Sequence, residues 1–286
     1  MIKCLPFLLI FTISCSQPIS PEQSIIEKTP PSEKIFDTPE SVLWQKSSNS
    51  FYVSSIGGRP AEKDGKGWIS KLDEKGKVIS SKWVDGLNAP KGMGAIGNHL
   101  YVSDIDQIVE IDINKGEILR RIDIPDAAFL NDITTNTTLV LISDTGKGQI
   151  YSFDPKAGKV GVFSNSKDLS AINGLLLDGD RLIGGSIGND TLGAMLDISL
   201  AGETKIIKAE VGKIDGIVKD EHGYLITDFR GLLLHMNDVG KIRVVEDLTQ
   251  TRGLKSSADL GYNPETKLVG IPDFLGNKVI FFTIGE

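Results

Sequence analysis

Two stretches of the chain, "INGLLLDGDRLIGGS" (Ile172–Ser186) and "IDGIVKDEHGYLITD" (Ile214–Asp228), follow one pattern. Each has an apolar residue, then Asn or Asp, then Gly, an apolar run, a polar turn and a second apolar run. Asn173 and Asp215 hold the same place in the two copies and are 42 residues apart. A repeat of this length is typical of proteins that use one supersecondary unit many times.

The same unit recurs along most of the chain. Its six repeat-start residues are Glu40, Lys91, Asn131, Asn173, Asp215 and Asp259. Successive members are 40 to 44 residues apart, except for a 51-residue step between the first two. That longer step contains a Gly-, Lys- and Asp-rich insertion, "IGGRPAEKDGKG" (Ile56–Gly67), so the repeat itself keeps its length.

Each copy contains four short apolar runs separated by turn residues. In the copy that starts at Lys91, the third and fourth runs are "QIVEIDINKG" and "EILRRIDI". Four strands in about 40 residues predict an all-β, six-bladed β-propeller, whereas a β-sandwich would not explain the period. The sixth copy lacks a fourth run, and we expect "EKIFDT" (Glu33–Thr38) to supply this strand and close the last blade.

The first residues predict export rather than folding. "MIKCLPFLLIFTISC" (residues 1–15) has the form of a signal peptide, and Ser14 before Cys15 resembles a bacterial lipobox, although a plain secretory signal is the alternative. Cys15 is therefore the expected lipidation site, and the Pro- and Ser-rich residues 16–32 are a flexible tether to a propeller over residues 33–286. We expect an exported, periplasmic or cell-surface protein that is lipid-anchored to a bacterial membrane.

Composition narrows the class of partner. The formal net charge is -7, from 31 basic and 38 acidic residues, which argues against nucleic acid binding. The chain has no phosphate-binding loop, no G-x-S-x-G elbow and no C-x-x-C motif. We expect a monomer that binds a small-molecule substrate or ligand and contacts the membrane only through its lipid.

The repeat-start residues predict a polar ring. The first strand of each propeller blade lines the central channel, so these three carboxylates, two amides and one amine should meet at one channel mouth. One divalent cation would offset their repulsion, and oxygen ligands suit Ca²⁺ or Mg²⁺ better than Zn²⁺. A wet ring that is neutralised by Lys91 is the alternative, and the residues alone leave both open.

A second set of polar residues ends the second apolar run of each copy. Its members are Ser55, Asp104, Asp144, Ser186, Asp228 and Asp273. Asp and Ser are favoured in turns because their side chains accept hydrogen bonds from nearby backbone N–H groups. We expect most of this set to cap turns.

Four of the repeat starts resemble marked positions of a known family. "ESVLW" at Glu40, "FLND" at Asn131, "INGL" at Asn173 and "IDGI" at Asp215 are similar, in order and spacing, to motifs of the senescence marker protein-30 (regucalcin)/gluconolactonase/LRE-like family. The resemblance, closest to a bacterial secreted lipoprotein-like branch, implies a six-bladed propeller with one divalent cation, most often Ca²⁺ or Zn²⁺. It implies Glu40, Asn173 and Asp215 as metal ligands, with Asp215 also a general base.

The same resemblance implies hydrolysis of lactones or related esters. Asn131 would contact the substrate or the water beside the metal, and Lys91 and Asp259 would add substrate contacts. The chain departs from the family at Val42, where Pro is usual, and in "DAAFLND" (Asp126–Asp132), which lacks a preceding Arg. The alternative function is a non-catalytic propeller that binds a small ligand or a protein, because "LNAPKGMGAIGNHLYVSDIDQIVEID" (Leu87–Asp112) is similar to an NHL repeat.

Overall fold

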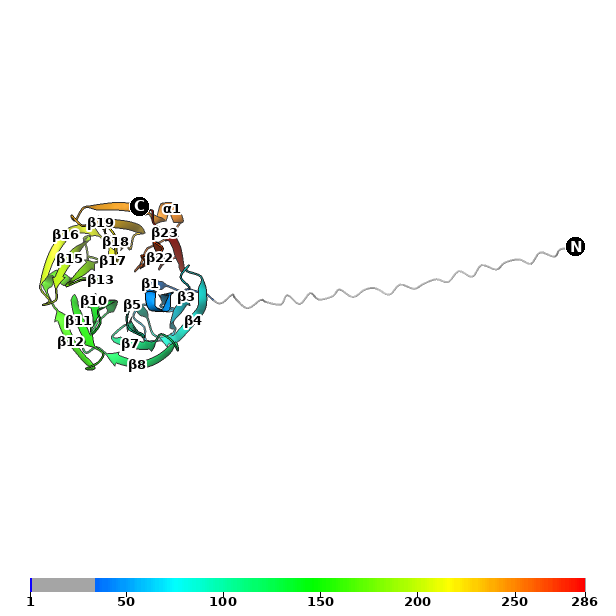
Figure 1. The fold of residues 1–286 in the computed structure, drawn as a ribbon, viewed down its shortest axis with the longest axis horizontal. Coiled ribbons are helices and arrows are strands. Elements are labelled where there is room, and N and C mark those ends of the chain that lie inside the picture. The colour runs from blue at the N-terminus through cyan, green and yellow to red at the C-terminus, as the bar shows by residue number, and fades with distance from the viewer. Residues whose placement is uncertain (2–33, 286) are drawn as a thin grey trace. The chain divides into compact units, whose positions relative to one another are not determined.

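The computed structural model of the chain describes Met1 and residues 34–285. Residues 34–285 form six small antiparallel sheets arranged around a ring (Figure 1), which confirms the six-bladed β-propeller. The predicted signal peptide, the lipidation site Cys15 and the tether at 16–32 lie outside the described residues. Within the described part of the chain, no helix is long and apolar enough to cross a bilayer.

The strands follow the chain from blade to blade. Blade 1 holds β1 (Pro39–Gln45), β2 (Ser50–Ser55), β3 (Gly67–Leu72) and β4 (Val78–Leu87). Blade 2 holds β5 (Pro90–Ile96), β6 (His99–Asp104), β7 (Gln107–Asp112) and β8 (Glu117–Asp123). Blade 3 holds β9 (Leu130–Thr135), β10 (Val140–Asp144), β11 (Gln149–Asp154) and β12 (Lys159–Ser164).

The second half of the ring repeats this order. Blade 4 holds β13 (Ile172–Asp178), β14 (Arg181–Ser186), β15 (Gly193–Ser199) and β16 (Thr204–Gly212). Blade 5 holds β17 (Ile214–Asp220), β18 (Gly223–Asp228), β19 (Leu232–Asn237) and β20 (Ile242–Asp247), and blade 6 holds β21 (Gly261–Asn263), β22 (Leu268–Asp273) and β23 (Lys278–Thr283). The short helices are η1 (Lys46–Ser48), η2 (Lys167–Leu169) and α1 (Leu248–Arg252).

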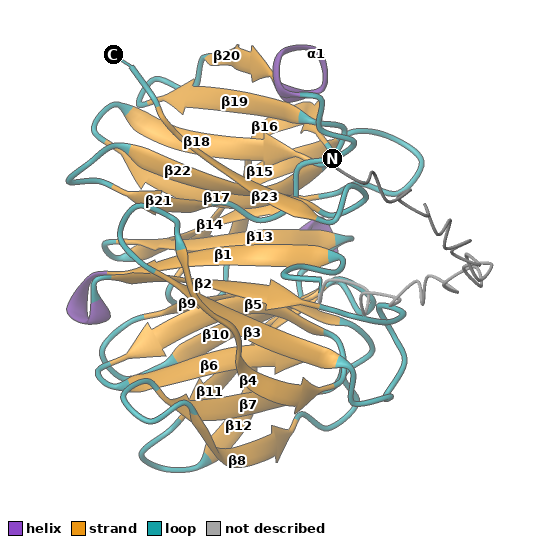
Figure 2. Ribbon diagram, turned by 90° about the vertical axis from the view of Figure 1, so that its right-hand side faces the viewer, coloured by secondary structure: helices purple, strands orange, loops and turns teal. Residues whose placement is uncertain are grey.

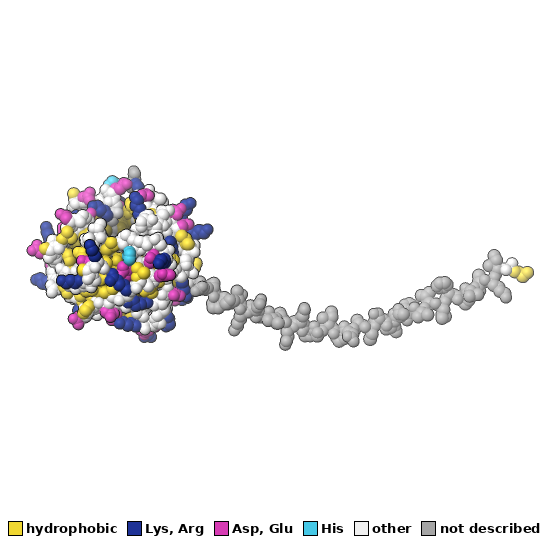
Figure 3. All heavy atoms as spheres, turned by 60° about the horizontal axis from the view of Figure 1, so that its bottom comes forward, with side chains coloured by type: hydrophobic (Ala, Val, Ile, Leu, Met, Phe, Trp, Pro, Cys, Tyr) yellow, Lys and Arg dark blue, Asp and Glu magenta, His cyan; other side chains and the backbone are white. Residues whose placement is uncertain are grey.

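The apolar core lies between neighbouring blades. In one cluster, Tyr101 and Ile108 of blade 2 pack against Leu130 and Ile142 of blade 3. The outermost strands face solvent, as the mostly exposed β8 shows. Figure 2, turned by 90°, shows the loops gathered at the two ends of the strands, which are the two faces of the ring. Acidic and basic side chains are interspersed on the side of the molecule that Figure 3 shows.

In blades 1 to 5, the pairing register shifts near the start of the innermost strand. The pairing of β1 with β2, for example, skips from Pro39 to Val42, and the pairing of β17 with β18 skips from Ile214 to Ile217. Such a bulge leaves an inner N–H without its ladder partner and redirects the side chain beside it. The repeat-start residues Glu40 and Asp215 stand at these bulges.

Hydroxyl groups on the neighbouring strand satisfy the bulged backbone. Ser54 Oγ accepts a hydrogen bond from Ser41 N, 3.0 Å, and Ser143 Oγ accepts one from Asp132 N, 2.9 Å. These serines are fully buried. In blades 1, 3 and 5, the Ser or Thr that precedes the last residue of the second strand therefore keeps the bulge intact at the channel mouth.

The expected turn caps are confirmed at three second-strand ends, where Asp144, Asp228 and Asp273 each accept from an N–H of their own turn. Asp104 instead accepts from Asn88 N and Ala89 N of the preceding linker. Asp104, Asp144, Asp228 and Asp273 are fully buried. Asp144 accepts from the N–H groups of Ala128, Phe129 and Lys147, so it ties the preceding blade linker to its own turn. These carboxylates belong to the scaffold.

The prediction that an N-terminal strand completes blade 6 is wrong for the described residues. That sheet has three strands, β21-β22-β23, and Lys34–Thr38 is not a strand. The backbone turns at Thr38, whose φ is 51°, and Thr38 N donates to Asn277 Oδ1 at 2.7 Å while Thr38 O accepts from Ile56 N. The ring is closed instead by the inner strands, where Val42 N donates to Asp259 O and Asp259 N to Glu40 O, both at 3.0 Å.

Candidate functional site

The repeat-start residues occupy equivalent places in the ring. Glu40, Lys91, Asn131, Asn173 and Asp215 are each the second residue of the innermost strand of their blade, and each is at most 6 % exposed. Asp259 precedes β21 and forms a parallel bridge with Ser41. All six polar side chains therefore lie at one mouth of the channel, as the repeat predicts.

Three of these side chains end in buried oxygens without a partner. Glu40 Oε2, Asn173 Oδ1 and Asp215 Oδ1 accept no hydrogen bond from residues 34–285. Leaving a buried polar atom unsatisfied costs about 1–3 kcal/mol, more for a charged group. These are the same three residues that the family resemblance implies as metal ligands.

The carboxylates of the ring raise one another's pKa. Burial raises the pKa of Glu40 and of Asp215 well above the usual range, and neighbouring carboxylates raise both further. Burial also raises the pKa of Asp259 to about 7, although a hydrogen bond from Ser41 opposes this shift. The ring thus concentrates negative charge that must be neutralised by protons, by Lys91 or by a cation.

Asp132 joins this acidic group, although the repeat pattern did not select it. It is 5 % exposed, and its pKa is raised by burial and then by Asp259. Its Oδ2 accepts from Leu175 N of the next blade and its Oδ1 from Ile133 N, both at 2.6 Å. Strict strand alternation would turn Asp132 away from the channel, but the bulge after Leu130 breaks that alternation. The "FLND" motif was the one signal that contained it.

Glycine follows the ring residue where the next blade comes close. A Cβ on Gly174 would overlap the carbonyl oxygen of Asp215, and one on Gly216 would overlap the Asp259 carboxylate. The repeated Asn/Asp-Gly pair therefore has two separate causes. The polar residue faces the ring, and the glycine allows successive ring residues to approach each other.

Lys91 is directed toward the inserted loop. Its Nζ donates to the carbonyl oxygens of Pro60 and Ala89, each at 3.1 Å, and lies 4.3 Å from the centre of the Phe129 ring. Burial lowers the pKa of the Lys91 ammonium, while the carboxylates of Glu40 and Asp104 raise it. Lys91 thus offsets part of the ring charge and has one N–H left after its two carbonyl contacts.

Asn131 and Asp259 are both held by hydroxyl groups. Asn131 Nδ2 donates to Thr145 Oγ1 at 3.2 Å, and Thr145 Oγ1 donates in turn to Ile172 O at 2.7 Å. Ser41 Oγ donates to Asp259 Oδ2 at 2.5 Å. These contacts fix one end of each side chain and leave Asn131 Oδ1 and Asp259 Oδ1 for a ligand.

The donor set suits a hard cation. Glu40, Asn173 and Asp215 would supply two carboxylates and one amide oxygen, the ligand type that Ca²⁺ and Mg²⁺ prefer. Among residues 34–285, no three His, Cys, Asp or Glu side chains are grouped as metal ligands. A site here therefore depends on the amide of Asn173, and the lack of His and Cys argues against Zn²⁺.

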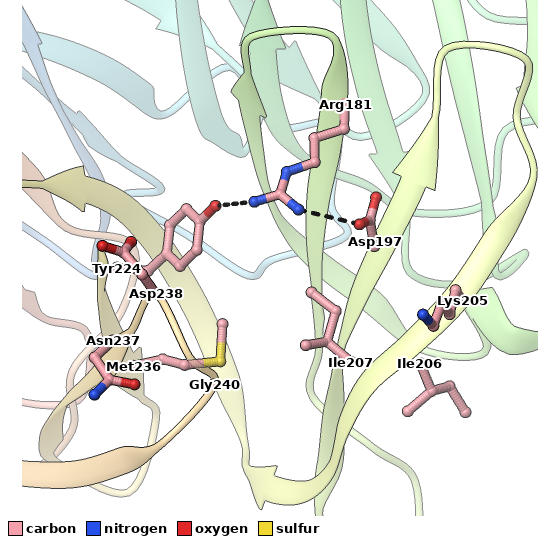
Figure 4. Close-up of a pocket in the computed structure, with 10 residues that line it drawn as sticks. All are labelled: Arg181, Asp197, Lys205, Ile206, Ile207, Tyr224, Met236, Asn237, Asp238 and Gly240. Atoms are coloured by element: carbon pink, nitrogen blue, oxygen red, sulfur yellow. Dashed lines mark hydrogen bonds and ion pairs between the residues drawn. The ribbon is translucent and has the colours of Figure 1, made fainter. Parts of the chain in front are cut away.

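A separate cavity of about 340 Å³ lies between the outer parts of blades 4 and 5 (Figure 4). There the Arg181 guanidinium donates to Tyr224 Oη at 3.0 Å and to Asp197 Oδ2 at 3.2 Å. Ile206, on the outermost strand β16, is 49 % exposed beside it. None of its lining residues belongs to the ring.

Comparison with known proteins supports the fold. No protein-family model matches the chain, and no curated protein matches it. Among solved structures, one titled as a streptogramin B lyase structure is similar, with a TM-score of 0.59 and 14% identity over 85% of this chain and 92% of that one. The crystal structure of a nidogen/laminin complex is similar too, with a TM-score of 0.56 and 13% identity over 86% of this chain and 92% of that one. At these identities, the likeness shows a β-propeller fold.

Proposed function

We propose that the protein is a divalent-cation-dependent hydrolase of lactones or related esters, with its active site at the channel mouth. Glu40, Asn173 and Asp215 would hold the cation, with Ca²⁺ as the expected ion and Mg²⁺ or Zn²⁺ as alternatives. The observation that carries the proposal is the set of three buried, unpaired oxygens on these three residues. One cation would satisfy all three and offset the neighbouring negative charge that adds to the raised pKa values of Glu40 and Asp215.

A cation bound here would polarise a carbonyl oxygen and lower the pKa of a nearby water. The chain itself would then need to accept a proton. Asp259 suits this role better than Asp215, because its pKa of about 7 is close to physiological pH and Ser41 orients its carboxylate. Asn131 and the remaining N–H of Lys91 would orient the substrate.

The second candidate is a non-catalytic propeller that binds a small ligand or a protein partner. The observation in its favour is that burial keeps the pKa of Glu40, Asp132 and Asp215 high, so protonation alone can neutralise the ring. One structural neighbour is also a protein in a nidogen/laminin complex. Under this function, a cation would be absent or would serve only the fold.

Cation binding and hydrolysis separate the two candidates. Wild-type protein should gain thermal stability when Ca²⁺ is added, because binding to the folded state alone shifts the unfolding equilibrium. Asp215→Asn should lose that gain and lower lactone hydrolysis by about 100-fold or more, since a cation ligand is weakened. Asp197→Asn, which removes a carboxylate on the outer wall, is the matched control.

Two results would count against the hydrolase. One is a wild-type melting temperature that does not respond to Ca²⁺, Mg²⁺, Mn²⁺ or Zn²⁺. The other is a broad panel of lactones and esters that stays intact with each of these ions present. A cation response without hydrolysis would support the binding function with a structural ion.

We also propose that the chain is exported and anchored through a lipid on Cys15. Cys15→Ser should then move the protein from the membrane fraction to the soluble fraction. Retention of the variant in the membrane fraction would contradict this.

A further inference from the structure

Four blades carry an apolar rim on the face that bears the ring. Ile56, Ala89 and Ile105 form a buried cluster, and Phe274 packs against it. The Phe229 ring lies 5.7 Å from the Phe274 ring. Except for Ala89, these residues directly follow the second strands of blades 1, 2, 5 and 6. The rim therefore covers the side of the mouth formed by those blades.

Blades 3 and 4 present a polar cavity on the same face instead. Its volume is about 280 Å³, close to the lower end of small-molecule sites. The walls are the loop after β10, at residues 145–148, the linker before β13, at residues 165–171, and Asn189. Lys147 and Lys167 are among the lining residues, and no carboxylate is.

This cavity shares a wall with the ring. Thr145 lines the cavity, and its hydroxyl accepts from Asn131 Nδ2 and donates to Ile172 O. Ala171 also lines the cavity and is two residues before Asn173. A ligand that fills the cavity would therefore extend directly to the two amides of the ring.

The two lysines are available to a ligand. Both are exposed, and neither forms an ion pair with another residue in the range 34–285. The carboxylates on the same segments are already engaged, since Asp144 accepts from Lys147 N at 3.0 Å and Asp168 accepts from Thr204 Oγ1 at 3.0 Å. The lining therefore keeps two positive charges.

The far wall of the cavity is held in place without a ligand. Lys213 Nζ donates to the carbonyl oxygens of Asn189 at 2.9 Å and Thr191 at 3.0 Å. Asn189 Nδ2 donates to Ser170 Oγ at 3.2 Å across the cavity wall. A pre-formed wall lowers the entropy cost of binding.

We infer that this cavity binds a small anionic group, a carboxylate or a phosphate, on the molecule whose reacting carbonyl lies at the ring. The position of a reacting carbonyl at the ring rests on the proposed function, whereas anion binding by Lys147 and Lys167 does not. The substrate class then narrows to acidic lactones or esters. An acidic group can pair with both lysines, whereas a neutral substrate would leave them solvated by water.

Direct titration tests anion binding apart from catalysis. Inorganic phosphate and gluconate would each be titrated into the full chain by NMR, in EDTA so that no bound cation recruits the anion. Wild-type protein should bind at least one of them saturably, and Lys147→Gln/Lys167→Gln should weaken that binding by about tenfold or more, since two charge-assisted hydrogen bonds are lost. Lys156→Gln/Lys159→Gln, at the other end of the strands of blade 3, removes the same charge and should stay within about twofold.

A kinetic arm tests the link to the ring. A lactone that bears a free carboxylate would be compared with its methyl ester, and Lys147→Gln/Lys167→Gln should raise KM for the acid alone. Two titration results would overturn the inference: no saturable binding of either anion to the wild type, or equal weakening in both double variants. Binding that follows the prediction while every lactone stays intact would keep the anion site and reject the hydrolase.

Discussion

The Ser41 hydroxyl donates a 2.5 Å hydrogen bond to the Asp259 carboxylate and so joins the first blade to the last. The same pair forms the parallel bridge that closes the ring. Ring closure and the candidate base are therefore coupled through a single side chain.

Replacing Ser41 by alanine should change both the pKa of Asp259 and the stability of the closed ring. The hydrogen bond from Ser41 lowers the pKa of Asp259, so Ser41→Ala should move the rising limb of the pH–rate profile to higher pH. The free energy of unfolding should fall by about 1.5–3 kcal/mol, the usual value of a hydrogen bond to a charged group. Urea unfolding and a pH profile would measure the two effects, with the exposed Ser47→Ala as control. A stability loss with an unchanged profile would leave Asp259 a structural residue only.

The raised carboxylate pKa values predict an unusual pH dependence of stability. Between the unfolded pKa, about 4, and the folded value, about 7 for Asp259, the folded protein binds more protons than the unfolded chain. The stabilisation is thus complete below about pH 4 and is lost as pH rises through 7, with a total on the order of a few kcal/mol.

Urea unfolding in EDTA at a series of pH values would measure the slope of the unfolding free energy against pH. Asp259→Asn should reduce it, because that residue no longer takes up a proton. Added Ca²⁺ should flatten it, since a cation replaces the protons. A stability that rises from pH 5 to pH 8 in EDTA would contradict the ring electrostatics.

The period of the sequence was enough to locate the blades and the ring. Blades 2 to 5 have nearly the same length, so Asn173 and Asp215 stand at equivalent points, and the remaining ring residues follow by counting once the insertion in blade 1 is allowed for. Turn chemistry likewise predicted the caps at Asp144 and Asp273, because an Asp at a strand end accepts nearby N–H groups.

Features that depend on departures from regular pairing could not be counted in this way. The bulge that brings Asp132 into the acidic group has no periodic signal. The orientation of Lys91 depends on Pro60, which belongs to an insertion found in one blade. A strand at Glu33–Thr38 was expected to pair with the exposed edge of blade 6, yet hydrogen bonds between Glu40, Val42 and Asp259 close the ring without it.

Truncation tests how the ring is closed. Because the six sheets lie within residues 34–285, deletion of residues 1–33 should change the melting temperature by less than about 2 °C. Deletion of residues 1–38 also removes the acceptors of Ile56 N and Gly57 N, and it should lower the melting temperature by several degrees more. Thermal unfolding of both proteins would show this, and equal melting temperatures would mean that residues 34–38 do not brace blade 1.

Asp273 should be the most sensitive turn cap. It is fully buried and accepts from Lys255 N, Ser256 N and Gly276 N, so it fastens the linker before blade 6 to the turn after β22. Asp273→Ala leaves Lys255 N and Ser256 N without an acceptor, while Gly276 N keeps its bond to the backbone carbonyl of residue 273, and it should cost about 2–4 kcal/mol of unfolding free energy. Urea unfolding of Asp273→Ala would measure this loss, with Asp85→Ala, at an exposed position, as the control. Because Asp273 caps a turn and does not belong to the ring, the cation response of the folded variant should remain, and its loss would place Asp273 in the site.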